Sequence, residues 1–264
     1  MRFSGKSIVV TSAGSGWARA IAVRLAREGA NVIVLDAEAG AAQDTCEEIR
    51  GTGGKARGYG VDIADLKALQ KLVSAELADL SSIDGLLTSY MAMDWTSVEN
   101  CDIDEFARVV QYDLVGPVAA TKAFLPLLKA SGRAAIVHLS SIDGINGSPR
   151  VPSYSAAKGG LLSLTRVMAF EFAGYNIRVN AIATGQTVQI PESEMPTNDS
   201  LGFPGFPGAQ FMRQLNEATP LKRHGPLTDW AGSAAFLLSD DADYVTGSVL
   251  VVDCGRLAIT PGTH

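Results

Sequence analysis

The stretch Ser7-Ile8-Val9-Val10-Thr11-Ser12-Ala13-Gly14-Ser15-Gly16-Trp17-Ala18 starts as a short apolar strand and continues as a glycine-containing turn. A helical pattern follows and ends at Gly29, after which residues 31–35 form a second apolar strand closed by Asp36. This order is typical of a dinucleotide-binding βαβ unit, because the helix N-terminus offers free N–H groups to a pyrophosphate. Asp36 can accept both hydroxyls of the adenosine ribose, and its charge repels a 2′-phosphate. The unit therefore favours NAD over NADP.

Strands and helices continue to alternate along the rest of the chain. Strands are expected near 55–61, 84–88, 134–139, 177–182 and 248–253, and helices over 38–50, 64–80, 103–130 (with kinks at Pro117 and Pro126), 151–174, 208–217 and 227–239. This alternation predicts an α/β fold, a doubly wound Rossmann fold with a parallel sheet of about seven strands. We expect one NAD(P)-binding domain over 1–264, with a proline- and glycine-rich substrate lid at about 186–217.

The stretch from Ser141 to Lys158 carries the candidate chemistry. Ser141 follows the buried strand at the carboxyl edge of the sheet, where open α/β sheets bind ligands. Tyr154 and Lys158 are four residues apart on a helix and so share one face. A nearby ammonium lowers the pKa of a phenol, which can then exchange a proton with an alcohol or carbonyl oxygen held by the Ser141 hydroxyl. The alternative for the pair is an ordinary Tyr and Lys on an amphipathic helix.

Composition limits the partners and the location. The 264 residues carry a net charge of −6 with a pI near 5.1, so neither nucleic acid nor an anionic membrane is an expected partner. Three widely spaced cysteines fit neither a disulfide framework nor a metal site, and the N-terminus has no apolar leader segment. We expect a cytoplasmic protein that needs no metal.

The chain as a whole resembles the short-chain dehydrogenase/reductase family. The matching features are Thr11 to Ala18, Asp36, Asp62, Ser141, Tyr154-x-x-x-Lys158, Arg178-Val179-Asn180-Ala181, Pro220-Leu221-x-Arg223 and Val245-Thr246-Gly247. The resemblance implies a nicotinamide cofactor, a homotetramer or homodimer, and a small alcohol or ketone as substrate. It implies Tyr154 as acid/base, Ser141 as oxygen anchor, and Lys158 as the residue that holds the nicotinamide ribose and lowers the tyrosine pKa.

The same resemblance implies further site residues. Asp113 takes the place of the family's fourth catalytic residue, usually Asn, whose backbone carbonyl holds a water that links Lys158 to solvent. The expected cofactor-binding residues are Ser12, Gly14, Ser15, Gly16, Trp17, Asp36, Asp62, Ile63, Ser89, Tyr154, Lys158, Thr184, Gly185 and Thr187. For Asp62 two roles remain open: contact with the adenine amino group, or capping of the helix that starts at Ala64. Trp17 can cover the cofactor phosphates or pack as ordinary core.

Four departures from the family pattern support a second hypothesis. Ser12 and Ala18 replace glycines of the turn, and Met91 stands where a glycine lets the backbone pass the adenosine. The charge of Asp113 opposes a lowered tyrosine pKa unless this carboxyl is protonated or paired. The principal prediction is an NAD(H)-dependent oxidoreductase that interconverts a secondary alcohol and a ketone. The alternative is a binding or regulatory protein of the same fold, with weakened cofactor binding and no turnover.

Overall fold

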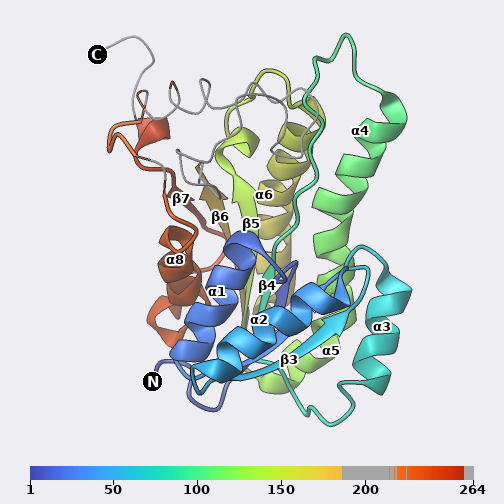
Figure 1. The fold of residues 1–264 in the computed structure, drawn as a ribbon, viewed down its shortest axis with the longest axis vertical. Helices are drawn as coiled ribbons and strands as arrows, with labels where there is room; N and C mark the ends of the chain where they lie inside the picture. Colours follow the sequence, from blue (N-terminus) through green and yellow to red (C-terminus); the bar gives the residue numbers. More distant parts are fainter. Residues whose placement is uncertain (186–213, 215–216, 218, 224, 259–264) are drawn as a thin grey trace.

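The computed structural model describes residues 1–185, 214, 217, 219–223 and 225–258. Seven parallel strands form one sheet in the order β3-β2-β1-β4-β5-β6-β7 (Figure 1). They are β1 (Ser7–Thr11), β2 (Asn31–Asp36), β3 (Lys55–Gly60), β4 (Gly85–Thr88), β5 (Ala134–Ser141), β6 (Ile177–Thr184) and β7 (Val249–Val252). The order reverses direction between β1 and β4, which is the switch point of a doubly wound fold. The predicted Rossmann fold with about seven strands is confirmed.

Helices cover both faces of the sheet (Figure 1). The described helices are α1 (Gly16–Arg27), α2 (Ala39–Gly51), α3 (Leu66–Ala75), α4 (Ile103–Val110), α5 (Gly116–Ser131), α6 (Pro152–Phe172) and α8 (Asp229–Leu238). Side chains of β1 alternate between two apolar cores: Ile8 and Val10 join the core under α1, α2 and α8, and Val9 joins the core under α3, α5 and α6. Central strands buried on both faces explain the continuous apolar runs in the sequence.

The bounds expected for the helix over 64–80 were wrong, whereas the region expected over 103–130 is helical throughout. The helix expected from Ala64 begins at Leu66, because the Asp65 carboxylate caps it by accepting from the Lys67 N–H at 2.8 Å. The helical region expected over 103–130 is divided by a π-helical segment over Gln111–Val115. Pro117 lies just after this segment, and because the preceding residues are helical, its missing N–H removes one intrahelical bond at the π segment. The expected helix 208–217 and the lid lie outside the described residues, apart from residues 214 and 217.

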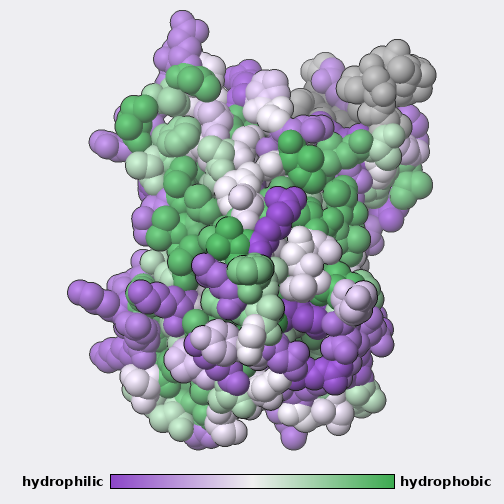
Figure 2. All heavy atoms as spheres, turned by 180° about the vertical axis from the view of Figure 1, so that it is seen from behind, coloured by the Kyte–Doolittle hydropathy of each residue, from purple (hydrophilic) through white to green (hydrophobic). Residues whose placement is uncertain are grey.

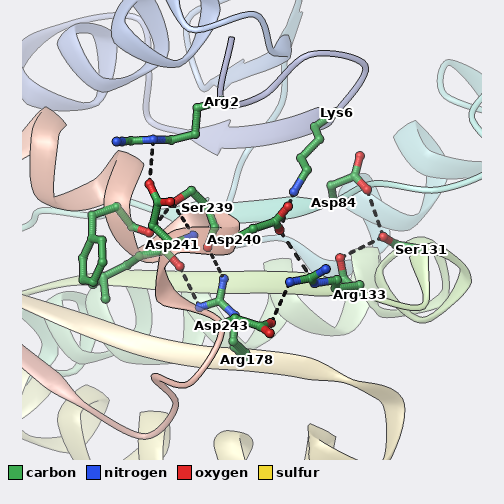
Figure 3. A network of polar contacts seen from close by, with 12 residues as sticks. Arg2, Lys6, Asp84, Ser131, Arg133, Arg178, Ser239, Asp240, Asp241 and Asp243 are labelled. Carbon is green, nitrogen blue, oxygen red and sulfur yellow. Dashed lines mark hydrogen bonds and ion pairs between the residues drawn. The ribbon is translucent and has the colours of Figure 1, made fainter.

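A network of charged side chains joins segments at the amino-terminal edge of the sheet (Figure 3). Lys6 and Arg133 both contact Asp240, at 2.7 and 3.7 Å, and Arg133 also contacts Asp243 at 3.0 Å. Arg178 donates to the backbone carbonyl of Leu237. These contacts fix the connection after α8 to the starts of β1, β5 and β6. The network lies at the edge opposite to the strand ends that carry Ser141, so we regard it as structural.

The face away from α1 and α2 carries apolar side chains across its middle (Figure 2). On the helices α4 and α6, the exposed apolar residues are Ile103, Val167 and Phe170, and the exposed fraction of Phe170 is 86%. An exposed apolar surface of this kind usually marks an interaction site. Among the described residues, no helix is long and apolar enough to cross a membrane.

Candidate active site

Two parallel strands and one helix bring polar side chains to the carboxyl edge of the sheet. Ser141 is the last residue of β5 and pairs in register with Thr184, the last residue of β6. Tyr154 and Lys158 lie in the first two turns of α6, which packs against β5 and β6. The Lys158 Nζ lies 5.3 Å from the centre of the Tyr154 ring. The structure therefore brings three of the four residues expected to be catalytic, Ser141, Tyr154 and Lys158, together at this edge.

The Tyr154 side chain is buried in a small apolar cluster with Ala92, Val109 and Val151. The partly buried side chains that pack against this cluster are Met91, Met93, Trp95 and Tyr112. Burial raises the pKa of the Tyr154 phenol well above its usual value, the Asp113 and Asp143 carboxylates raise it further, and a hydrogen bond with Ser141 lowers it. The prediction that the pKa of Tyr154 is lowered was wrong. Burial dominates, and two negative charges act on the phenol.

Lys158 is buried and fully engaged. Its Nζ donates to the Tyr90 carbonyl at 2.6 Å and lies 3.4 Å from the Asp113 Oδ2. A weaker contact of 3.4 Å reaches the Leu139 carbonyl. The ammonium is thus paired with a carboxylate, which explains why it does not lower the pKa of Tyr154: the two opposite charges largely cancel at the phenol.

Asp113 sits in the π-helical segment and is completely buried. Its Oδ1 accepts from the Ala92 N–H at 2.7 Å, while its Oδ2 makes only the ion pair with Lys158 among the described residues. Burial raises the pKa of this carboxyl, and the charge of Lys158 lowers it. The π turn adds one residue to the helix, and the Asp113 carboxylate in this turn lies beside the Lys158 ammonium.

The glycine turn between β1 and α1 supports a phosphate site. Ser12 has a φ of 49°, in the left-handed region that suits the glycine it replaces. A Cβ at Gly14 would lie 2.6 Å from the Ala41 Cβ and 2.8 Å from the Asp36 Oδ2, so this position needs glycine. Ser15 is the N-cap of α1, its side chain makes no capping bond, and the first turn holds no acidic residue. Ser15 is exposed, and Gly16 has a φ of 58°. The N–H groups at the start of α1, which no side chain caps, therefore lie at this exposed turn.

The two acidic residues expected near the adenosine, Asp36 and Asp62, accept hydrogen bonds from nearby backbone N–H groups. The Asp36 Oδ2 accepts from the Gly14 N–H at 2.9 Å, and its Oδ1 accepts from the Glu38 N–H at 3.1 Å. Asp62 is exposed and accepts from the Ala64 N–H at 2.9 Å, so it caps the turn before α3, and Asp65 caps the helix. Ile63 is buried, and its carbonyl accepts from the Tyr90 hydroxyl at 2.6 Å.

Trp17 packs against other side chains of the fold. Its ring centre lies 5.2 Å from that of Trp230 in α8, and its Nε1 donates to the Ser89 Oγ at 3.1 Å. The backbone of Ser89 is fixed in turn by Thr11, whose Oγ1 accepts from the Ser89 N–H. Packing is therefore the observed role of Trp17, and Ser89 lies buried beside the turn.

At the end of β6, the Thr184 hydroxyl donates to the Ser140 carbonyl at 2.9 Å. A Cβ at Gly185 would lie 2.6 Å from the Asp253 Cα, so Gly185 permits a close approach of two backbones. Thr187 lies outside the described residues. Among the described residues, no group of three or more His, Cys, Asp or Glu side chains could hold a metal ion.

Three residues of the site carried no expected role. Asp143 comes two residues after Ser141, and its N–H donates to the Ser141 Oγ at 3.1 Å. Asp94 is buried and accepts from the hydroxyl of Ser153, the residue before Tyr154. Burial raises the pKa of the Tyr112 phenol, the Ser12 hydroxyl lowers it, and Asp36 and Asp62 raise it, so this ring lies beside the glycine turn. The sequence hint for Asp143 was its place next to Ser141; the other two required the fold.

The chain matches a family model described as "Enoyl-(Acyl carrier protein) reductase" over residues 12–256. It is 31% identical to 2-(S)-hydroxypropyl-CoM dehydrogenase 3 of Xanthobacter autotrophicus, over 98% of this chain and 99% of that protein. The structure is similar to that of an NAD⁺-bound xylitol dehydrogenase, with a TM-score of 0.84, 30% identity, and 96% and 99% of the two chains covered. It is also similar to a short-chain type dehydrogenase/reductase of Mycobacterium marinum, with a TM-score of 0.86, 25% identity and 97% of each chain covered.

Proposed function

Because the chain belongs to the short-chain dehydrogenase/reductase family, we propose that it is an NAD(H)-dependent oxidoreductase that interconverts a secondary alcohol and a ketone. The observation that carries this proposal is the convergence of Ser141, Tyr154 and Lys158 at the carboxyl edge of the sheet. Dehydrogenases are among the relatives, and the dehydrogenase for xylitol, a similar structure, binds NAD⁺.

The residues around the glycine turn fit a dinucleotide. Gly14 lets the turn pack directly against Ala41 and Asp36, and the first turn of α1 presents N–H groups without a side-chain cap. These donors would hold the pyrophosphate, and Asp36 at the end of β2 would accept the ribose hydroxyls and reject a 2′-phosphate. Lys158 would hold the nicotinamide ribose after exchanging its present contact with the Tyr90 carbonyl.

Each catalytic side chain then has one task. When bound, the nicotinamide accepts a hydride from the alcohol carbon or returns it to the ketone carbon. The Tyr154 phenolate takes the proton from the substrate hydroxyl during oxidation, and the phenol returns it during reduction. The Ser141 hydroxyl holds the substrate oxygen, and Asp113 anchors the Lys158 end of the proton relay. The apolar cluster around Tyr154 keeps bulk water from the reacting atoms.

We also propose that the protein is a homo-oligomer, a tetramer or a dimer, that uses the apolar face on α4 and α6. The exposed Phe170 and Val167 side chains support this proposal, since burying them against a second copy would remove apolar area from water. The three cysteines are unpaired, which suits a cytoplasmic protein.

A calorimetric titration with NAD, NADH and NADPH tests the cofactor assignment first. Micromolar binding that favours NAD(H) is the expected result. Binding of none of the three would refute it and favour the alternative of a binding or regulatory protein, in which Ser12, Ala18 and Met91 crowd the site.

The second test is the variant Tyr154→Phe with a panel of secondary alcohols. It should lose turnover and keep cofactor affinity, because the ring stays and only the proton-transferring hydroxyl is removed. Substantial residual turnover would exclude Tyr154 as the acid/base.

A further inference from the structure

Asp143 is held near the catalytic side chains by one hydrogen bond and by the packing of its 3₁₀ turn. It lies in the 3₁₀ turn Ile142–Gly144 that directly follows Ser141, and its N–H donates to the Ser141 Oγ at 3.1 Å. A Cβ at Gly144 would lie only 2.6 Å from the Lys158 carbonyl carbon, so the turn packs directly on the backbone of α6. The position of Asp143 is therefore fixed relative to Ser141, Tyr154 and Lys158.

The Asp143 carboxylate has one oxygen engaged and one open. Its Oδ1 accepts from the Ser148 hydroxyl. Within the described ranges, no hydrogen bond or ion pair reaches its Oδ2, and the side chain is half-buried. A partly buried carboxylate oxygen without a donor is a strong acceptor for a ligand O–H, since hydrogen bonds to charged groups are about twice as strong as neutral ones.

Two negatively charged carboxylates act on the Tyr154 phenol. They belong to Asp113 and Asp143, and they add to the burial that raises the pKa of this phenol. The Lys158 ammonium is paired with Asp113 at 3.4 Å. Arg150 lies on the connection that follows Asp143, and its side chain is exposed. A negatively charged substrate group next to the reacting carbon would therefore meet like charge.

We propose that Asp143 is a specificity-determining residue that selects neutral diols and polyols over hydroxy acids. Its Oδ2 accepts a hydrogen bond from a second substrate hydroxyl next to the carbon that is oxidised. That second hydroxyl stays unchanged. The oxidised carbon gives its hydride to NAD⁺, which becomes NADH, and its hydroxyl proton goes to Tyr154 as the C=O bond forms. This inference rests on the proposed function and names the substrate class of the same site.

Matched substrate pairs test the inference. The pairs are propane-1,2-diol with lactate, and cyclohexane-1,2-diol with 2-hydroxycyclohexanecarboxylate, each compared by kcat/KM for the wild type, Asp143→Asn and Asp143→Ala. The wild type should prefer the diol of each pair by about tenfold or more, the effect of one like charge at close range. Asp143→Asn keeps an acceptor for Ser148 and should lose most of this preference. The matched control is Asp79→Asn, which removes an exposed carboxylate from the segment that follows α3. This variant should leave the preference between the two substrates unchanged.

A second readout does not depend on turnover. Calorimetry of the protein saturated with NADH should show the diol binding more tightly than the hydroxy acid, with the difference lost in Asp143→Asn. Turnover or binding with an unchanged preference in folded Asp143→Asn would overturn the role of Asp143 and leave the proposed function intact. Failure of every alcohol to react with NAD and NADP, together with no cofactor binding, would overturn the proposed function and this inference with it.

Discussion

The ion pair between Lys158 and Asp113 should control the pH at which Tyr154 ionises. The Lys158 Nζ lies 3.4 Å from the Asp113 Oδ2 and 5.3 Å from the centre of the Tyr154 ring. Asp113→Asn removes the negative charge and keeps an oxygen that can accept from the Ala92 N–H. The variant thus leaves the lysine charge uncompensated next to the phenol.

The geometry sets the size of the effect. Taking the 5.3 Å from the Lys158 Nζ to the centre of the Tyr154 ring as the charge separation, and an effective dielectric constant of about 20, the ammonium stabilises the phenolate by about 3 kcal/mol, or about two pKa units. Asp113 now cancels a large part of this and itself raises the pKa of Tyr154. Removing its charge should therefore lower the pKa of Tyr154 by about one to two units, with solvent rearrangement accounting for the smaller value.

The pH profile of kcat/KM for alcohol oxidation measures this shift. Oxidation needs the phenolate, so the rate rises with pH up to the pKa of Tyr154, and in Asp113→Asn this rise should move to lower pH. Ultraviolet difference titration of tyrosinate, compared between each protein and its Tyr154→Phe counterpart, gives the same pKa without turnover. Asp79→Asn, which removes an exposed carboxylate, should leave the profile unchanged.

An unchanged or upward-shifted profile in folded Asp113→Asn would refute the reasoning. Removing one partner of a buried pair typically costs about 3–5 kcal/mol, so the fold of the variant is checked by circular dichroism and thermal unfolding. Lys158 keeps its 2.6 Å bond to the Tyr90 carbonyl, which limits this cost. If the single variant does not fold, Asp113→Asn combined with Lys158→Met removes both charges, and tyrosinate titration of this double variant should give a lower pKa for Tyr154 than in the wild type.

Three further predictions concern the cofactor, acid stability and assembly. Asp36→Ala should reduce the preference for NAD over NADP by about tenfold in calorimetric Kd values, because a charged acceptor for the ribose is lost; an unchanged ratio would show that Asp36 does not contact the ribose. Burial lowers the pKa of His138 to about 3. Between about pH 6.5 and 3, His138 is therefore protonated in the unfolded chain but neutral in the folded one. The free energy of unfolding should fall by about 5 kcal/mol in total as the pH is lowered through this window. Denaturant unfolding at a series of pH values should show this fall in the wild type and not in His138→Asn, and an equal dependence on pH in the two proteins would contradict the prediction. Phe170→Glu should shift the protein to smaller species in analytical ultracentrifugation, whereas the exposed control Gln70→Glu should not; an unchanged mass would exclude this face as the contact.

The fold could be predicted because its signals are local. Central strands that are buried on both faces have continuous apolar sequences, as Val32 to Leu35 and Ala134 to Leu139 do. The helix boundaries were less accurate for a physical reason. Asp62 and Asp65 are both good caps, and only the three-dimensional structure shows that Asp65 accepts from the first turn of α3. The π turn at Asp113 was also not predictable, because a single turn of this kind leaves no repeating hydrophobic pattern in the sequence.

The grouping of the catalytic residues was also predictable, but the electrostatics was not. The spacing of Tyr154 and Lys158 on α6 places them on one face, and this holds in the structure. Spacing does not tell which other groups compete for the ammonium. The carbonyl of Tyr90 and the carboxylate of Asp113 come from a strand end and a π turn that are distant in sequence, and they engage Lys158. Burial then raises the pKa of Tyr154, which the sequence pattern predicted to be lowered.

Under the proposed function, this reversal has a consequence for the direction of the reaction. The acid at the end of β2 favours NAD, the cofactor usually used for oxidation. A phenol whose pKa is raised by burial and by two carboxylates stays protonated at neutral pH, and a protonated phenol is the form that reduces a ketone. The two features therefore act in opposite directions near neutrality. Burial and the Asp113 charge both favour the protonated phenol, so removing the Asp113 charge should favour oxidation relative to reduction.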